Sequence, residues 1–235
     1  MDNKTFNSAY YMETKSPSYA RTLLDCKRVA ASNANVLLIG ESGTGKSASL
    51  RNLDPEKLAL IQAIKKPLPF RHFIKPYVTD NWEKIISSMK LAAEKGRKII
   101  VIDDFQYVMA NEFMRRSTEV GFTKFTEIGN HAWEIFVAAA ALPDDVRVYI
   151  LSHVEETNSG TIKIKTIGKM LDEKVTVEGM FTIVLRTGVS DGQYFFRTKN
   201  NGSDTVKSPM GMFDMDTIDN DLAFVDQKIC EYYGI

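Results

Sequence analysis

The chain has 235 residues, and its 30 Lys and Arg balance its 30 Asp and Glu, so the formal net charge is zero. This length suits one sizeable α/β domain. The balanced charge gives no argument for or against nucleic acid and confines any polyanion site to a local patch. Two cysteines, Cys26 and Cys230, are too few for a disulfide framework or a zinc site. We therefore expect a cytoplasmic protein, and no apolar run is long enough to cross a membrane.

The first predicted elements lead into a glycine-rich loop. Residues 1–17 are polar and predict an arm, and residues 19–31 follow a helical pattern. The apolar run at 36–39 predicts a buried strand, and a helix is expected from Lys46 to the Asp-Pro pair at 54–55. Between them the chain matches the phosphate-binding pattern G-x-x-x-x-G-K-[ST]. The eight residues of this loop are Gly40, Glu41, Ser42, Gly43, Thr44, Gly45, Lys46 and Ser47.

The chemistry of this loop suits a nucleoside triphosphate. Its glycines let the main chain curl so that successive N–H groups face one anion, and the start of the following helix adds a positive dipole end. Lys46 is expected to reach the outer phosphates, and Ser47 to hold Mg²⁺. A structural glycine-rich turn is the alternative, against which the strand–loop–helix context argues.

The next segment alternates strands and helices. Residues 58–61 predict a second strand, which a basic, proline-stiffened loop at 65–71 follows. A helix is expected to start at Thr79 or Asp80, with Glu83 completing a capping box, and to end at Gly96.

A second sequence signal, which is acidic, follows at residues 98–104, where a β-branched run ends in Asp103 and Asp104. Such a run is typical of a buried parallel strand that delivers carboxylates to a site. We expect Asp103 to hold Mg²⁺ together with Ser47. Asp104 stands where many ATPases place a water-orienting Glu, and three interpretations stay open: catalytic base, structural cap, or a sign of slow hydrolysis.

The middle of the chain predicts a helix at 122–142 and a strand at 146–151, followed by Ser152 and His153. An apolar cluster after the acidic strand predicts core or a subunit contact rather than a surface for base stacking; its members are Met109, Phe113, Met114, Phe122 and Phe125. Because the carboxyl ends of parallel strands share one crevice, His153 is a candidate sensor of the terminal phosphate. Its alternative role is to satisfy backbone groups at a strand end.

A lysine-rich segment follows at 155–174. Its residues 160–166 alternate with the period of a strand, and a short helix is expected at 169–174. Lys163 and Lys165 are candidates for contact with the phosphates of single-stranded DNA. Lys169 is a candidate cationic finger that acts in a neighbouring subunit's site. A solvated lysine face is the alternative to both.

The C-terminal part predicts a strand at 181–186, a hairpin at Asp191-Gly192 that returns through 194–196, and a helix at 219–233. No internal repeat or domain boundary is evident. The whole chain, 1–235, is therefore expected to form a single α/β domain with a mostly parallel sheet flanked by helices, ending in a β-hairpin and a helix.

Three stretches resemble a known family. They are Ile-Val-Ile-Asp-Asp-Phe-Gln-Tyr-Val-Met-Ala-Asn-Glu-Phe-Met-Arg-Arg at 100–116, Thr-Ile-Gly-Lys-Met-Leu-Asp-Glu-Lys at 166–174 and Glu-Gly-Met-Phe-Thr-Ile-Val-Leu-Arg at 178–186. They resemble phage-encoded AAA-type ATPases with a RecA-like core, grouped with the Sak-type single-strand annealing proteins. The resemblance implies a P-loop NTPase that binds ATP and Mg²⁺ and acts on single-stranded DNA in the host cytoplasm. Homo-oligomers, phage single-strand binding proteins and replication proteins are the implied partners.

One departure from this family bears on catalysis. RecA-type recombinases place a water-orienting Glu after the second core strand, whereas this chain has Gln62 there and no acid until Asp80. The catalytic base stays open, and hydrolysis could be weak. The alternatives are a helicase loader or replication accessory, and a nucleotide-gated assembly protein with little turnover. A nucleotide kinase fits poorly, because the expected lid region supplies lysines rather than arginines.

Overall fold

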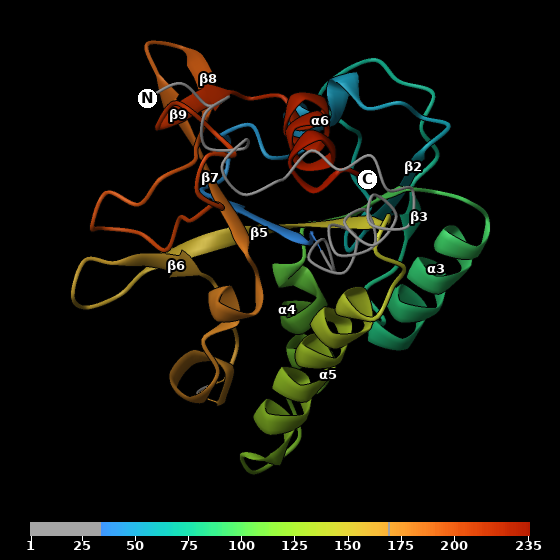
Figure 1. Cartoon of the computed structure of the whole chain (residues 1–235). Helices are drawn as coiled ribbons and strands as arrows, with labels where there is room; N and C mark the ends of the chain where they lie inside the picture. Colours follow the sequence, from blue (N-terminus) through green and yellow to red (C-terminus); the bar gives the residue numbers. More distant parts are fainter. Residues whose placement is uncertain (1–33, 169) are drawn as a thin grey trace, which may run out of the picture.

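The computed structural model describes residues 34–168 and 170–235, and shows a mixed α/β fold built on one central sheet (Figure 1). The predicted arm at 1–17, the predicted helix at 19–31 and Lys169 lie outside the described residues. Within those residues the sheet has nine strands, eight of which form a continuous path, with the ninth, β6, pairing with β5. In spatial order the path is β3 (Tyr77–Val78), β2 (Leu58–Gln62), β4 (Ile99–Asp103), β5 (Arg147–Glu156), β1 (Val36–Gly40), β7 (Ile183–Ser190), β8 (Gln193–Arg197) and β9 (Thr217–Asp219).

The sheet is mostly parallel, as predicted. Strands β3, β2, β4, β5, β1 and β7 pair in parallel with their neighbours, and β8 and β9 add an antiparallel ribbon. Strand β6 (Ile162–Ile164) turns back along the outer end of β5. The carboxyl ends of β1, β4 and β5 therefore lie at one edge. The loop at residues 40–47, which we call the phosphate loop after the sequence pattern that it matches, leaves β1 at this edge.

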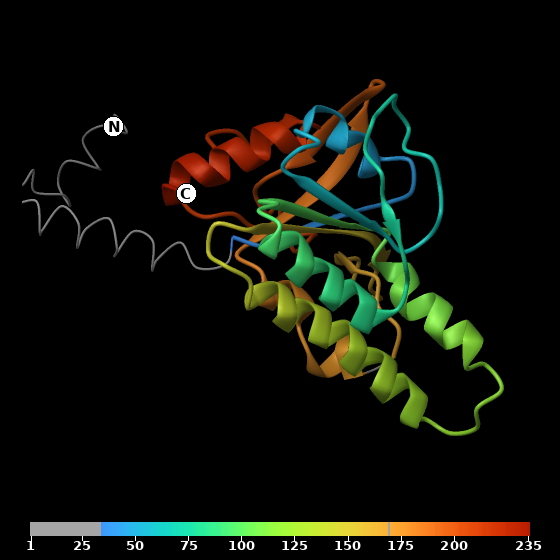
Figure 2. The same cartoon turned by 90° about the vertical axis from the view of Figure 1, so that its right-hand side faces the viewer.

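Helices cover both faces of the sheet (Figure 2). On one face lie α3 (Trp82–Glu94), α4 (Gln106–Arg115) and α5 (Thr123–Ala140), and on the other lie the short 3-10 helix η1 (Ser47–Asn52) and α6 (Leu222–Tyr233). A hydrophobic core lies on each face of the sheet, and successive residues of a central strand point into one core and then the other. Ile102 packs with the first helix group, and Val101 packs with the second. Because both faces are covered, the central strands are continuous apolar runs in the sequence.

An ion-paired network fixes α6 to the sheet. The Arg147 guanidinium on β5 donates two hydrogen bonds to the Asp226 carboxylate on α6, at 2.9 and 2.7 Å, and the Tyr149 hydroxyl donates a third at 2.5 Å. Breaking a buried pair of this kind costs about 3–5 kcal/mol. The network holds the N-terminal end of α6, with Asn220 and Asp221 before it, against η1 beside the phosphate loop.

Several predicted elements differ in extent. The helix after the phosphate loop has only six residues and 3-10 geometry, so the expected contribution of a helix dipole to anion binding is small. Helix α3 begins one residue after Asn81, whose side chain accepts the hydrogen bond from the Lys84 N–H. The predicted cap at Thr79 or Asp80 is therefore wrong. Strand β5 continues past His153 to Glu156, and β7 extends to Ser190.

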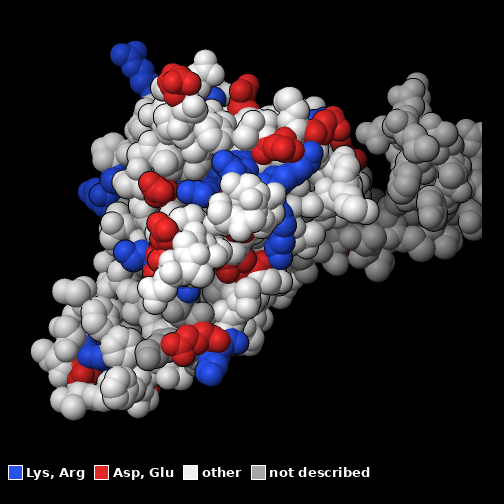
Figure 3. Space-filling model, turned by 90° about the vertical axis from the view of Figure 1, so that its left-hand side faces the viewer, with Lys and Arg blue, Asp and Glu red and all other residues white. Residues whose placement is uncertain are grey.

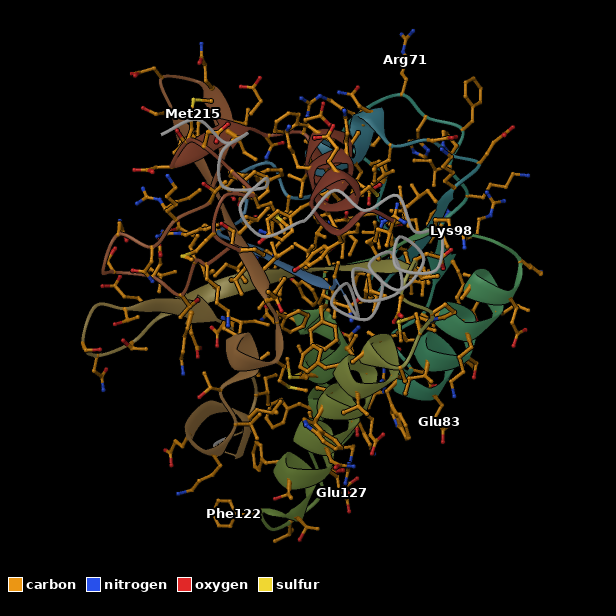
Figure 4. The ribbon with its side chains drawn as sticks, in the orientation of Figure 1. Arg71, Glu83, Lys98, Phe122, Glu127 and Met215 are labelled. Carbon is orange, nitrogen blue, oxygen red and sulfur yellow. The ribbon has the colours of Figure 1, made fainter. Side chains whose placement is uncertain are left out.

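Helix α4 was not predicted from the sequence. It and α5 form a hairpin that projects from the sheet, with Phe122 at its outer end (Figure 4). Met109 of the apolar cluster is buried in the core, whereas Met114 and Phe122 are exposed. Short strands β3 and β9 also go unpredicted, because two or three residues carry no periodic signal.

Candidate functional site

The loop at residues 40–47 curls tightly at the end of β1. Gly45 has a φ of +94°, and a Cβ atom there would lie 2.9 Å from a Tyr194 ring carbon and 3.0 Å from the Asn220 side chain. At Gly40 a Cβ atom would lie 1.8 Å from the Thr187 hydroxyl oxygen. Both positions therefore require glycine, for close packing at Gly40 and for packing and backbone conformation at Gly45.

Lys46 closes the loop. Its ammonium group donates hydrogen bonds to the Gly40 and Glu41 carbonyl oxygens, both at 2.7 Å. Burial lowers the pKa of Lys46 to about 8, and the negative charges of Asp104 and Asp103 oppose that shift. A phosphate in the loop would favour the charged ammonium, so Lys46 is poised to exchange carbonyl acceptors for phosphate oxygens.

Ser47 and Asp103 meet beside the loop. The Ser47 hydroxyl lies 3.1 and 3.0 Å from the two Asp103 carboxylate oxygens. Burial, and then the charge of Asp104, raise the pKa of Asp103, whose side chain is fully buried. A divalent cation at this carboxylate would favour its ionised form.

The oxygen atoms of Ser47 and Asp103 fit a hard cation such as Mg²⁺. Among residues 34–168 and 170–235, no group of three or more His, Cys, Asp or Glu side chains could hold a metal ion. An ion here would therefore take its remaining ligands from water and from a bound phosphate, which is how Mg²⁺ is usually held at nucleotide sites.

Asp104 lies at the centre of a charged cluster with Lys66 and His153. Its main chain has a φ of +60°, a conformation that costs a non-glycine residue about 1–3 kcal/mol. One carboxylate oxygen lies 2.5 Å from the Lys66 ammonium nitrogen, and the other 3.6 Å from His153 Nε2. Burial acts to raise the pKa of Asp104, but His153 and Lys66 outweigh it, and the net shift is downward. Asp104 is thus an ionised carboxylate beside the loop.

His153 and Gln62 lie on β5 and β2, the two strands on either side of β4, near the end of β4 that carries Asp103. His153 pairs with Gly40 in the β1–β5 register, and Gln62 pairs with Asp103 in the β2–β4 register. The buried Gln62 side chain lies beside the Asp103 carboxylate and acts to lower the pKa of Asp103. The buried hydroxyl of Ser152 has no hydrogen-bond partner among the described residues. The Ser152 hydroxyl is therefore available to a ligand or a water molecule at the same edge of the sheet.

The lysines proposed for DNA lie on the β5–β6 hairpin. Lys163 is on β6 and forms an ion pair with Glu155 at 3.5 Å, and Lys165 follows β6 and is exposed. The Lys165 N–H donates to the His153 carbonyl oxygen, which joins the hairpin to the edge that carries the charged cluster. The structure does not describe Lys169, so its proposed role stays a prediction.

Two neighbours of the loop were not predicted from the sequence. Asn220, just before α6, is buried against Gly45, and neither polar atom of its side chain has a hydrogen-bond partner among the described residues. Lys66 comes from the basic loop between β2 and β3. The only sequence signals for them were a lysine pair and an Asp-Asn-Asp turn, which many surface loops share.

No family model matches the chain, and no curated protein matches it. In the described part of the chain, none of the helices has the length and apolar character needed to cross a bilayer. The case for a function therefore rests on the loop, the Ser47–Asp103 contact and the Lys66–Asp104–His153 cluster.

Proposed function

We propose that the chain is a Mg²⁺-dependent ATPase with a RecA-like P-loop core that acts on single-stranded DNA during phage recombination or strand annealing. The observation that carries the proposal is the meeting of Ser47 with Asp103 beside a curled glycine loop that Lys46 closes. Main-chain N–H groups, one ammonium, one hydroxyl and one carboxylate are the groups that a Mg²⁺-bound triphosphate needs.

The loop and Asp103 have distinct roles in this proposal. The curled main chain binds phosphate oxygens, and Lys46 moves from the Gly40 and Glu41 carbonyls to the outer phosphates. Ser47 and Asp103 hold Mg²⁺, which when bound neutralises charge on the phosphates. ATP is preferred over GTP because the chain has no N-K-x-D guanine motif and because of the family resemblance.

Asp104 is the proposed base for hydrolysis. The oxygen of an attacking water bonds to the terminal phosphorus as the bond to the bridging oxygen breaks, and the water proton passes to Asp104 and then to the released phosphate. ADP and inorganic phosphate are the products. His153 orients Asp104 from the neighbouring strand. The Lys66 ion pair stabilises the anion and so makes it a weak base, which supports slow turnover.

The same ion pair supports a second candidate, a nucleotide-gated assembly protein that binds ATP and rarely hydrolyses it. A helicase loader or replication accessory keeps the ATPase core and exchanges DNA for a protein partner. In the favoured proposal, Lys163 and Lys165 contact DNA from the β5–β6 hairpin, and Lys169 acts on the site of a neighbouring subunit in a homo-oligomer. The compartment is the cytoplasm of the bacterial host.

A turnover assay separates these candidates. We expect ATP hydrolysis by the full chain to require Mg²⁺ and to rise when single-stranded DNA is added. Stimulation by a replicative helicase with no response to DNA would favour the loader, and tight ATP binding with turnover near background would favour the assembly protein. Charge reversal of Lys163 and Lys165 should weaken DNA binding. Unchanged DNA binding would remove the hairpin from the proposal.

A further inference from the structure

A groove of about 390 Å³ lies beside the phosphate loop, on the side away from Asp103. Its volume falls within the range of about 300–1,000 Å³ found for ligand sites. On the face that carries β6 to β9, Lys and Arg side chains gather in a patch (Figure 3). The lining residues come from the loop and from β7 and β8: Glu41, Thr44, Arg186, Thr187, Gly188, Val189, Phe195 and Arg197.

The two arginines of the groove retain their hydrogen-bonding capacity. Arg186 and Arg197 have side chains that are 22% and 30% exposed, yet neither guanidinium donates a hydrogen bond to any residue in the described ranges. Each carries five N–H donors in a planar fork that suits a phosphate. Both guanidinium groups can therefore still donate hydrogen bonds to an anion that enters the groove.

Asp204 balances only part of the positive charge of the two arginines. One of its carboxylate oxygens lies 3.6 Å from Arg186 and 3.9 Å from Arg197, and this buried oxygen accepts no hydrogen bond from the described residues. A single carboxylate thus faces two guanidinium groups. The other nearby acid, Glu41, is 66% exposed and lies 3.7 Å from Arg186, so it can move away when a ligand enters.

An aromatic ring completes the groove. A Cβ atom at Gly188 would lie 2.4 Å from the Phe195 ring, so that ring packs against the Gly188 main chain and forms part of the groove wall. Phosphate-binding arginines beside an aromatic wall are the two components of sites for single-stranded nucleic acid. The phosphate tail of ATP would use other groups, because Lys46, Ser47 and Asp103 lie together at the phosphate loop and do not line the groove.

We propose that this groove binds one nucleotide unit of single-stranded DNA, with its phosphate on Arg186 and Arg197 and its base on Phe195. The inference rests on the proposed function and assigns its DNA site to the β7–β8 ribbon in addition to the β5–β6 hairpin. It also supplies a route of regulation. Arg186 lies beside Glu41, and the Thr187 hydroxyl is 2.5 Å from the Thr44 hydroxyl, so DNA in the groove acts directly on the phosphate loop.

The test measures binding of fluorescein-labelled oligothymidylate by anisotropy, across a series of salt concentrations. Arg186→Gln combined with Arg197→Gln should weaken binding, and the salt slope should fall by about 0.7 for each DNA phosphate that the variant no longer neutralises. Phe195→Leu should weaken binding by about 5- to 150-fold with an unchanged salt slope, since base stacking contributes about 1–3 kcal/mol. Lys199→Gln, on the exposed segment after β8, is the control and should bind as the wild type does.

A companion variant and a second ligand keep the result decisive. Because Asp204 is buried, Arg186→Gln is also tested with Asp204→Asn, which avoids an unpaired carboxylate, and thermal unfolding checks the fold. A fluorescent ADP analogue reports on the phosphate loop separately. Groove variants that bind the oligonucleotide normally, or that lose the nucleotide analogue while keeping the oligonucleotide, would overturn the groove proposal. Wild-type protein that binds oligonucleotide through the groove but ignores ADP and ATP would overturn the proposed ATPase alone.

Discussion

Ser47 and Asp103 are 56 positions apart in the chain, and the Ser47 hydroxyl lies within 3.1 Å of both Asp103 carboxylate oxygens. Ser47 is the last residue of the loop at the end of β1, and Asp103 is the last residue of β4, with β5 between the two strands. The contact joins the two sequence signals that suggest a nucleotide site.

Substitution of these residues should remove the effect of Mg²⁺ on ATP binding. Ser47→Ala removes a hydroxyl ligand and Asp103→Asn removes the negative charge of the carboxylate, and we expect MgATP affinity to fall toward the value for free ATP. Calorimetric titration with and without Mg²⁺ measures the effect, with the exposed Asp214→Asn as control. A Mg²⁺ dependence that survives in Asp103→Asn would exclude this carboxylate as the ligand.

ATP affinity should fall as the pH rises through about 8. The pKa of Lys46 is lowered to about 8 by burial, so the ammonium is charged below that pH and progressively neutral above it. Only the charged form attracts phosphate. Binding above pH 8 therefore takes up a proton, and affinity should decline by up to about tenfold per pH unit. Titrations between pH 6.5 and 9.5 in buffers of different ionisation enthalpy measure both effects. Constant affinity across this range would contradict the role of Lys46.

Removal of Lys66 should move the acid limb of the pH–rate profile to higher pH. Lys66 is one of the groups that hold the pKa of Asp104 low, so Lys66→Met should raise that pKa, and the base should protonate at a higher pH. Lys65→Met is the matched control, because Lys65 is adjacent and exposed. An identical acid limb in wild type and Lys66→Met would argue that Asp104 is a structural cap.

A pair of glycine substitutions separates backbone strain from loop packing. Gly45 and Gly192 both have positive φ, +94° and +76°, but only Gly45 has neighbours where a Cβ atom would lie. Each change to Ala should cost about 1–3 kcal/mol in unfolding free energy. Gly45→Ala should also abolish nucleotide binding, whereas Gly192→Ala should retain it. Denaturant unfolding and ATP titration of both variants give the comparison, and normal binding by Gly45→Ala would contradict the assigned loop geometry.

The parts of the site that strands hold in place could be predicted from the sequence. The apolar runs before Gly40 and Asp103 are strands in the structure, and parallel strands bring their carboxyl ends together whatever the intervening chain does. The coarse fold class followed from the same alternation of strands and helices. Such predictions succeed because periodicity is a local property of the chain.

Irregular segments account for what the sequence could not predict. Lys66 reaches Asp104 from a loop, and Asn220 reaches Gly45 from a turn before α6 that the Arg147–Asp226 pair anchors. These contacts depend on long-range packing. The six-residue η1 also differs from the expected helix, since Asp54-Pro55 limits its length and tertiary contacts decide its geometry.

The most direct test of the central claim is calorimetric titration of the full chain with MgATP, comparing wild type with Lys46→Ala and with Lys57→Ala, an exposed lysine before β2. The account predicts saturable binding of one MgATP per chain by the wild type and Lys57→Ala, and none by a folded Lys46→Ala. Equal binding by all three proteins, or no binding by the wild type at millimolar MgATP, would contradict a nucleotide site at this loop.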